Sequence, residues 1–332
     1  MNYFCTLFDS FYLNRGLVMY QSLKEHCPEF HLYIFPFDDA ALKILQQLKL
    51  ENVTLVSLKE FENEALLAVK PGRTKGEYCW TCTSSTIDYC LKTFSLPHCT
   101  YIDADLCFYS DPTVLLDETK DKSVLITEHR YTPKYDQSAD CGVYCVQFIT
   151  FKNTSSGLQA LHWWRDRCLE WCYARFEDGK FGDQKYLDDW TTRFSDIHVL
   201  EHLGGGVAPW NVQQYDLSLH QNAWLVTEKE TGKQYPLVFY HFHYVKFFND
   251  GTVNYSDIYN LGFKAVLDLY KKYLKKIQSV NELLAGEFEF VAPLTQKPKR
   301  SALYRMAKKV YNKYQKIYGL YNNLEIKDLV KD

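Results

Sequence analysis

The order of short apolar runs and helical patterns over the first 56 residues constrains the fold of this chain more than any other feature. Residues 3–8 form an apolar and aromatic run that is typical of a buried strand, and residues 31–35 and 53–56 form two more. Apolar residues recur at helical spacing between the first two runs, and Asp38 can cap a helix that extends to Leu48. This strand, helix, strand order predicts an α/β fold with a mostly parallel central sheet flanked by helices.

Length and charge divide the chain into two predicted parts. The 332 residues are enough for a sizeable core, and we predict one α/β domain over residues 1–260 followed by a helical extension over residues 261–332. The extension is basic and rich in Tyr, with 15 Lys and Arg against 7 Asp and Glu from Gly262 onward, whereas the whole chain has a net charge of −3. An acidic body with a basic tail argues against a general nucleic-acid binder, so no nucleic-acid partner is expected.

No targeting or membrane-spanning segment is expected. The N-terminus lacks a basic region followed by an apolar stretch, and no run approaches the roughly 18 apolar residues that a membrane-spanning helix requires. Eleven cysteines in a long chain are typical of free thiols in a reducing compartment. The lone Cys79-Trp-Thr-Cys82 pair has no matching second pair that would indicate structural zinc. We therefore expect a cytoplasmic protein.

The basic extension has two interpretations. Residues 304–318 place four lysines among tyrosines and apolar residues. Such a stretch can lie on an anionic bilayer with its Tyr rings at the level of the headgroups, which would make the protein peripheral on the inner face of the membrane. A helix that packs on its own domain, with its Lys side chains extended to water, explains the same pattern equally well.

Two aspartates stand where the fold predicts a binding site. The charged residues 58–76 predict a loop leading into a helix over residues 84–93, and a short apolar strand over residues 99–102 then runs directly into Asp103-Ala104-Asp105. Ligands of parallel α/β sheets bind beyond the carboxyl ends of the strands. Two carboxylates at such an end supply hard oxygen ligands for Mg²⁺ or Mn²⁺, which complete their coordination with phosphates and water.

Other interpretations of the two aspartates stay open. In aspartate-dependent phosphatases the first Asp of a similar motif attacks phosphorus, but Cys107 stands where those enzymes usually have Thr or Val, and the motif does not follow the first strand. A non-catalytic nucleotide-sugar binding protein that has kept the fold is a second alternative, and a solvated turn at the end of a strand is a third. A mere binder should show a damaged set of metal ligands.

Two histidines are candidates for the remaining metal ligands. His241 and His243 come directly after an apolar strand over residues 237–240. A neutral imidazole is a good ligand for Mn²⁺, and the sequence leaves open which of the two binds. Lys246 is close enough in sequence to offer its ammonium group to a phosphate.

Four motifs follow one another along residues 3–250: Asp9-Ser-Phe-Tyr12, Tyr101-Ile-Asp-Ala-Asp105, Asp183-Gln184, and the stretch from His241 to Lys246. In this order they resemble the retaining glycosyltransferases of family eight, the group that contains glycogenin and bacterial lipopolysaccharide galactosyltransferases. The resemblance implies a GT-A fold and metal-dependent transfer of a sugar from a UDP-sugar donor to a hydroxyl of a glycan or lipid-linked sugar acceptor. It also implies retained stereochemistry and a role in cell-surface glycan synthesis.

The resemblance assigns roles to individual residues. Asp9 would bind the uracil by a hydrogen bond and Tyr12 would stack on it, while Asp183 and Gln184 would lie near the anomeric carbon. The donor-binding residues that it implies are Thr6, Asp9, Tyr12, Lys75, Asp103, Ala104, Asp105 and Lys246. A segment containing Trp210 and Asn211 would line the acceptor side.

Three positions depart from the family's pattern. Lys246 stands one residue earlier, relative to His241, than the phosphate-binding Lys of the family. Asp140 stands where the family has an Asn that faces the sugar, so an acidic group would replace an amide there. Thr86 occupies a position where the family often has Arg, and Lys75 and Arg73 are the two candidates to take over that charge.

Overall fold

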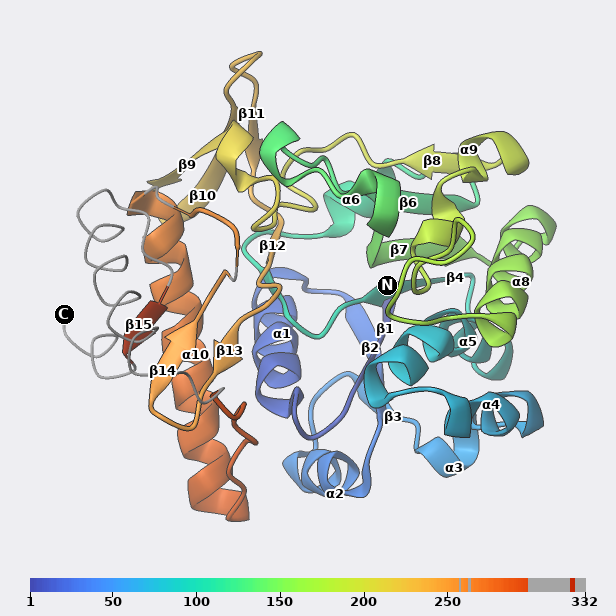
Figure 1. Ribbon diagram of the computed structural model, residues 1–332, viewed down its shortest axis with the longest axis horizontal. Helices are drawn as coiled ribbons and strands as arrows, with labels where there is room; N and C mark the ends of the chain where they lie inside the picture. The colour runs from blue at the N-terminus through green and yellow to red at the C-terminus, as the bar shows by residue number, and fades with distance from the viewer. Residues whose placement is uncertain (257, 262–263, 298–322, 326–332) are drawn as a thin grey trace.

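A central sheet of seven strands organises the computed structural model, which describes residues 1–256, 258–261, 264–297 and 323–325 (Figure 1). Its strands, in spatial order, are β3 (Val53–Leu55), β2 (Phe30–Pro36), β1 (Asn2–Phe8), β4 (His98–Ile102), β7 (Tyr144–Lys152), β6 (Val124–Glu128) and β8 (Ile197–Val199). All neighbours are parallel except β7, which is antiparallel to both β4 and β6. The predicted α/β fold with a mostly parallel sheet is confirmed.

Helices cover both faces of this sheet. The main helices are α1 (Leu13–His26), α2 (Asp39–Leu48), α5 (Lys75–Thr93), α8 (Ser155–Glu170) and α10 (Lys264–Phe288) (Figure 1). Because side chains alternate along a strand, Phe4 and Phe8 of β1 join a core with α1, α2 and α10, whereas Cys5 and Leu7 join another with α5 and α8. The sheet is therefore buried between two helical layers.

Local capping signals explain where the early helices begin. The Asp38 side chain accepts a hydrogen bond from the Ala41 N–H at 2.8 Å, which confirms the predicted cap of α2. The loop predicted over residues 58–76 is wrong, because capping by Ser57 and Asn63 starts two short helices there. These are α3 (Leu58–Phe61) and α4 (Glu64–Val69), followed by η1 (Lys70–Gly72), and α5 already begins at Lys75 rather than at residue 84.

Short elements outside the central sheet occupy much of the chain after β4. The strands are β5 (Leu106–Phe108), β9 (Tyr215–His220), β10 (Ala223–Glu228), β11 (Gln234–Pro236), β12 (Phe239–His241), β13 (Lys246–Phe247), β14 (Thr252–Asn254) and β15 (Asn323–Glu325). The helical turns are α6 (Thr113–Asp117), η2 (Pro133–Tyr135), α7 (Ser138–Cys141), η3 (Lys185–Leu187), α9 (Trp190–Arg193) and η4 (Val212–Gln214). The antiparallel pair of β5 and β12 sets His241 opposite Leu106, next to the paired aspartates.

Helix α10 packs on the segment that follows β12. The ring of Tyr273 stacks on the ring of Phe242 with centroids 3.7 Å apart and an interplanar angle of 2°. Tyr270 meets Tyr240 edge to face at 5.5 Å. Since these four rings are buried, the helix fixes the chain on either side of His241.

Two expectations about the extension stay predictions. The first is the division between residues 260 and 261. The second is contact of residues 304–318 with a membrane, because these residues lie outside the described part of the chain. Within the described part of the chain, every helix is too short or too polar to span a bilayer.

Candidate active site

Backbone hydrogen bonds from two directions fix the Asp103 and Asp105 segment at the carboxyl end of β4. The N–H of Asp103 donates to the carbonyl of Gln147 on β7 at 3.0 Å, and the N–H of Phe242 donates to the carbonyl of Asp105 at 3.0 Å. Strand β1, which leads to Asp9, lies beside β4 and runs parallel to it. The carboxyl ends of both strands therefore meet at one edge of the sheet, as the parallel arrangement predicts.

His241 lies directly against this pair of aspartates. Its Nε2 atom is 3.1 Å from Oδ1 of Asp105 and 3.8 Å from Oδ2 of Asp103. Its Nδ1 atom is 2.6 Å from Oε1 of Gln147. His243 joins the group, because the ligand atoms of Asp105, His241 and His243 all lie within 4.8 Å of one another. Both candidate histidines are thus near Asp105.

The chemistry and spacing of these side chains fit a divalent cation. Two ligands in neighbouring positions of an octahedral ion, each bound at about 2.1 Å, are about 3 Å apart, close to the 3.1 Å between His241 and Asp105. A proton on Nδ1 of His241 would donate to Gln147, so Nε2 would be the nitrogen that coordinates a cation once it has lost its own proton, an arrangement typical of metal-binding histidines. Carboxylate oxygens suit Mn²⁺ or Mg²⁺, and the imidazole nitrogens suit a transition-metal ion such as Mn²⁺ better than Mg²⁺.

Burial and mutual charge set the protonation of the group. Burial raises the pKa of Asp103 to about 6, and the charge of Asp105 adds to this effect while His241 opposes it. Burial also acts against ionisation of Asp105, but the charge and hydrogen bond of His241 outweigh it and lower the pKa to about 2. Burial lowers the pKa of His243 to about 4, together with the charge of His241. Asp105 is therefore the stronger acid of the two.

Asp183 and Gln184 approach the group from a turn after α8. The Asp183 carbonyl accepts a hydrogen bond from Nε1 of Trp164 at 2.8 Å. Burial raises the pKa of the Asp183 carboxyl to about 7, and the charge of Asp103 contributes, so the two carboxyls are electrostatic neighbours. Gln184 donates through Nε2 to the carbonyl of Cys141 at 2.9 Å. Asp140, on α7, is exposed, and in the described part of the chain it does not belong to the group of Asp105, His241 and His243.

The residues assigned to the donor's base lie at the start of α1. Oδ1 of Asp9 accepts from the backbone N–H of Phe11 at 3.0 Å and of Tyr12 at 3.2 Å, which turns the chain into the helix. Burial raises the pKa of Tyr12, and the charges of Asp105 and Asp103 add to the rise. The Tyr12 hydroxyl is therefore an electrostatic neighbour of the two aspartates.

Three further predicted donor-site residues occupy different positions. Thr6 is buried on β1, and its hydroxyl has no hydrogen-bond partner among the described residues. Nζ of Lys246 lies 3.7 Å from the centroid of the Tyr244 ring, and its charge contributes to the low pKa of His243. Lys75 is exposed at the first turn of α5. Lys246 is thus the cation nearer to the histidines.

Two residues that contact the site escaped the reasoning from sequence. Gln147 is an amide within an otherwise apolar stretch of β7, a position that could have been singled out. Arg15 is buried on α1, where Nη2 donates to the carbonyl of Val245 at 2.7 Å and the guanidinium lies 4.7 Å from the centroid of the Tyr12 ring. A charged residue within a run of buried helical positions was the available signal.

Trp210 and Asn211 complete the wall beside the histidines. The Trp210 ring meets His241 and His243 edge to face, at 5.3 and 5.5 Å between centroids. Asn211 is buried and donates through Nδ2 to the carbonyls of His129 and Gly206, both at 2.8 Å. These bonds hold the indole in place next to the candidate ligands.

Comparison with solved structures finds distant likenesses to glycosyltransferases. Mouse xyloside xylosyltransferase 1 matches with a TM-score of 0.41 and 12% identity, over 60% of this chain and 84% of that one. The galactosyltransferase LgtC with donor and acceptor sugar analogues matches with a TM-score of 0.41 and 12% identity, over 60% and 73%. An active-site mutant of LgtC matches with a TM-score of 0.46 and 11% identity, over 74% and 88%. The α/β fold of this chain is assigned from its own strand order and not from these matches.

Two proteins of Bacillus subtilis (strain 168) are more similar in sequence. YfnD, an uncharacterized protein, is 29% identical over 289 residues, which cover 83% of this chain and 91% of YfnD. YfnF, also uncharacterized, is 32% identical over 247 residues, which cover 72% of this chain and 80% of YfnF. No family model matches. The extent and identity of the match to YfnF show that this chain belongs to the same protein family as YfnF of Bacillus subtilis.

Proposed function

We propose that this protein is a metal-dependent glycosyltransferase that moves a sugar from a UDP-sugar to a hydroxyl of a glycan or lipid-linked acceptor. One observation carries the proposal: at the carboxyl edge of the sheet, Asp103 and Asp105 lie against His241, with the Tyr12 ring nearby. This set combines ligands for a cation that binds a diphosphate with an aromatic ring for a base. A role in cell-surface glycan synthesis and retained stereochemistry follow from the resemblance to family eight.

The donor would be held at three places. Asp103 and Asp105, with His241 or His243, would hold Mn²⁺ or Mg²⁺, which when bound neutralises charge on the departing diphosphate. Tyr12 would stack on the uracil, a contact that contributes about 1–3 kcal/mol per base in proteins that bind nucleic acids. Lys246 would offer its ammonium group to a phosphate oxygen.

Asp183 and Gln184 would face the reacting carbon of the sugar. In the transfer, the bond from the anomeric carbon to the diphosphate oxygen breaks and a bond to the acceptor oxygen forms, while the acceptor's proton passes to the diphosphate. The Gln184 amide would orient the sugar and the Asp183 carboxyl would stabilise positive charge on it. Electrostatic groups placed in this way contribute on the order of 10²-fold each in rate. Trp210 would offer an apolar wall to the acceptor.

The replacement Asp105→Asn tests the proposal. It removes one ligand charge and keeps the shape, so Mn²⁺-dependent transfer from a UDP-sugar should fall by about 10²-fold or more, with an unchanged far-UV circular dichroism spectrum. Asp178→Asn is the matched control, because Asp178 is an exposed loop residue with φ of 48°, a backbone conformation that Asn tolerates. Unchanged turnover in the Asp105 variant would refute the metal assignment.

Thermal unfolding tests the binding of UDP separately from the transfer reaction. UDP should raise the melting temperature of the wild-type protein only when Mn²⁺ is present, because a ligand that binds the native state stabilises it. Asp105→Asn should lose this cation-dependent shift and Asp178→Asn should keep it. A shift without transfer from any UDP-sugar would contradict the transferase and leave a binding protein. The absence of a shift would overturn the donor site itself.

A further inference from the structure

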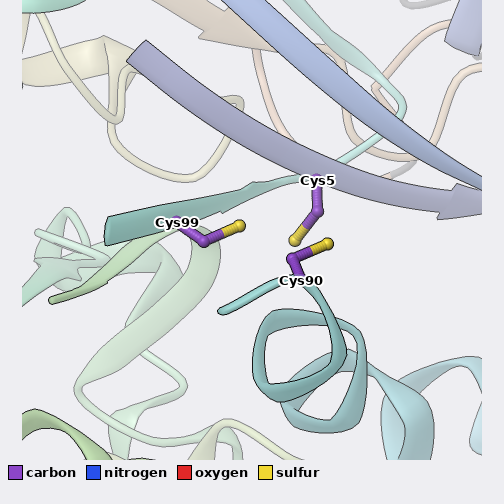
Figure 2. A group of neighbouring side chains, drawn as sticks. All are labelled: Cys5, Cys90 and Cys99. Atoms are coloured by element: carbon purple, nitrogen blue, oxygen red, sulfur yellow. The ribbon is translucent and has the colours of Figure 1, made fainter. Parts of the chain in front are cut away.

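Three cysteines that are far apart in sequence bring their sulfur atoms together inside the protein. Cys5 of β1, Cys90 of α5 and Cys99 of β4 place their Sγ atoms within 4.8 Å of one another (Figure 2). All three side chains are 0% exposed. We call this group the cysteine triad. It does not include Cys79 or Cys82, the closely spaced pair noted in the sequence.

Strand register explains why two of these thiols share one side of the sheet. Cys5 is opposite Tyr101 in the parallel pair of β1 and β4. Cys99 stands two positions before Tyr101, so its side chain points to the same face as Cys5. Helix α5 covers that face and contributes Cys90 from its last turns, and Figure 2 shows the three side chains converging. The triad therefore joins three elements that the backbone already holds in place.

The surroundings of the triad supply no harder ligands. The group belongs to the apolar core between the sheet and the helices α5 and α8. Oγ1 of Thr86 is 3.8 Å from Sγ of Cys5, and this hydroxyl already donates to the carbonyl of Thr83 at 2.7 Å. In the described part of the chain, no carboxylate or imidazole belongs to the group. The donor set therefore consists of three sulfur atoms.

We propose that the cysteine triad is a binding site for a soft, thiol-seeking metal ion of the copper(I) class. Thiolate sulfur selects soft ions such as Cu(I) and Zn(II). Structural zinc almost always has four ligands in a tetrahedron, whereas the triad offers three. Three sulfurs bound at about 2.3 Å in a plane around one ion are about 4 Å apart, so the side chains need to move by less than about 1 Å from their present positions.

Binding of the ion by the triad requires no oxidant or reductant. As the ion binds, each S–H bond of a ligating thiol is replaced by a sulfur–metal bond, the proton passes to solvent, and no sulfur changes its oxidation state.

The position of the triad gives the ion a structural role. Strand β1 continues from Cys5 to Asp9, and β4 continues from Cys99 to Asp103, so both strands end at the candidate active site. An ion bound by the triad would link these two strands to α5. Metal binding would therefore stabilise the fold and hold the two strand ends in register, whatever reaction the site catalyses.

Titration of the full-length protein with Cu(I) tests the proposal. The protein is kept anaerobic and reduced, and Cu(I) is supplied in competition with a coloured Cu(I) chelator. The partly exposed Cys79 and Cys141 are replaced by Ser in every sample, so that thiols outside the core do not compete. We expect one equivalent bound and a melting temperature raised by about 3 °C or more. If this protein binds no more Cu(I) than its Cys90→Ala and Cys99→Val variants do, the proposal is overturned.

Variants of the triad identify the ligands. Cys90→Ala suits a helix and Cys99→Val suits a strand, so both should keep the native circular dichroism spectrum and lose the bound equivalent and the thermal shift. Cys27→Ala is the matched control, because Cys27 is also buried but lies outside the triad. Retained binding in either triad variant would contradict the assignment.

Direct measurement on the protein with an intact triad does not depend on any triad variant folding. X-ray absorption of the sample with one equivalent of Cu(I) should show three sulfur neighbours at about 2.3 Å. A two-sulfur site, or a nitrogen or oxygen neighbour, would refute the triad. Parallel titration with Zn(II) decides the class of ion, because preferential binding of Zn(II) at these cysteines would overturn the choice of Cu(I).

Discussion

Replacing Tyr273 of α10 by Ala should destabilise the protein strongly. The Tyr273 side chain is 0% exposed and its ring stacks on Phe242 at 3.7 Å. Truncating a large buried aromatic residue to Ala costs about 3–5 kcal/mol, and the stacked pair accounts for about 0.5–1.5 kcal/mol of this. The free energy of unfolding of Tyr273→Ala should fall by about that amount.

Tyr273→Phe is the matched control for this prediction. It keeps the stacked ring and removes a buried hydroxyl that has no hydrogen-bond partner among the described residues. A buried polar group without a partner costs about 1–3 kcal/mol. The Phe variant should therefore be at least as stable as the wild-type protein, in contrast to the Ala variant.

Urea unfolding, followed by tryptophan fluorescence and far-UV circular dichroism, measures both effects from the shift in midpoint at a common slope. Because Phe242 stands between His241 and His243, the Ala variant should also lose more of the Mn²⁺-dependent stabilisation by UDP than the Phe variant. An Ala variant within about 1 kcal/mol of the wild-type protein would refute the conclusion that α10 supports the site. Equal losses in both variants would show that the hydroxyl, and not the ring, matters.

Two further predictions concern stability away from the site. Gly204→Ala should lower the melting temperature sharply, because the added Cβ would lie 1.8 Å from the backbone carbonyl oxygen of Pro236. Gly286→Ala on α10 is the control: its added Cβ would have no heavy atom within 4 Å, so this variant should be neutral or stabilising. Asp88 binds Lys92 at 2.8 Å, His162 at 2.9 Å and Arg165 at 3.0 Å, and although burial opposes ionisation, Lys92 and His162 lower its pKa. The contribution of ionised Asp88 to the free energy of unfolding is therefore complete above the unfolded pKa of about 3.9. It is lost as the pH falls through the lower pKa of the folded state. Urea unfolding should show Asp88→Asn about 1–3 kcal/mol less stable than the wild-type protein at pH 7 and nearly equal to it near pH 2; a pH-independent difference would contradict this.

Local sequence signals were enough to predict the early elements of the fold. Strand β1 and the cap of α2 at Asp38 follow from apolar periodicity and from a side chain that bonds its own helix, both of which act over a few residues. The same locality explains the error over residues 58–76, where charge suggested a loop but Ser57 and Asn63 supply caps. The position of Asp103 and Asp105 was predictable because a strand and the turn after it are neighbours in sequence.

What sequence by itself determined, then, is the α/β class, the start of α2 and the pair of aspartates at a strand end. The tertiary structure alone decided that β12 pairs with β5 and so brings His241 against Asp105, and that Gln147, 94 residues from His241 in sequence, binds its other nitrogen. It also decided that Cys5, Cys90 and Cys99 meet in the core. Such contacts depend on which strands and helices become neighbours, and no short stretch of sequence specifies that choice.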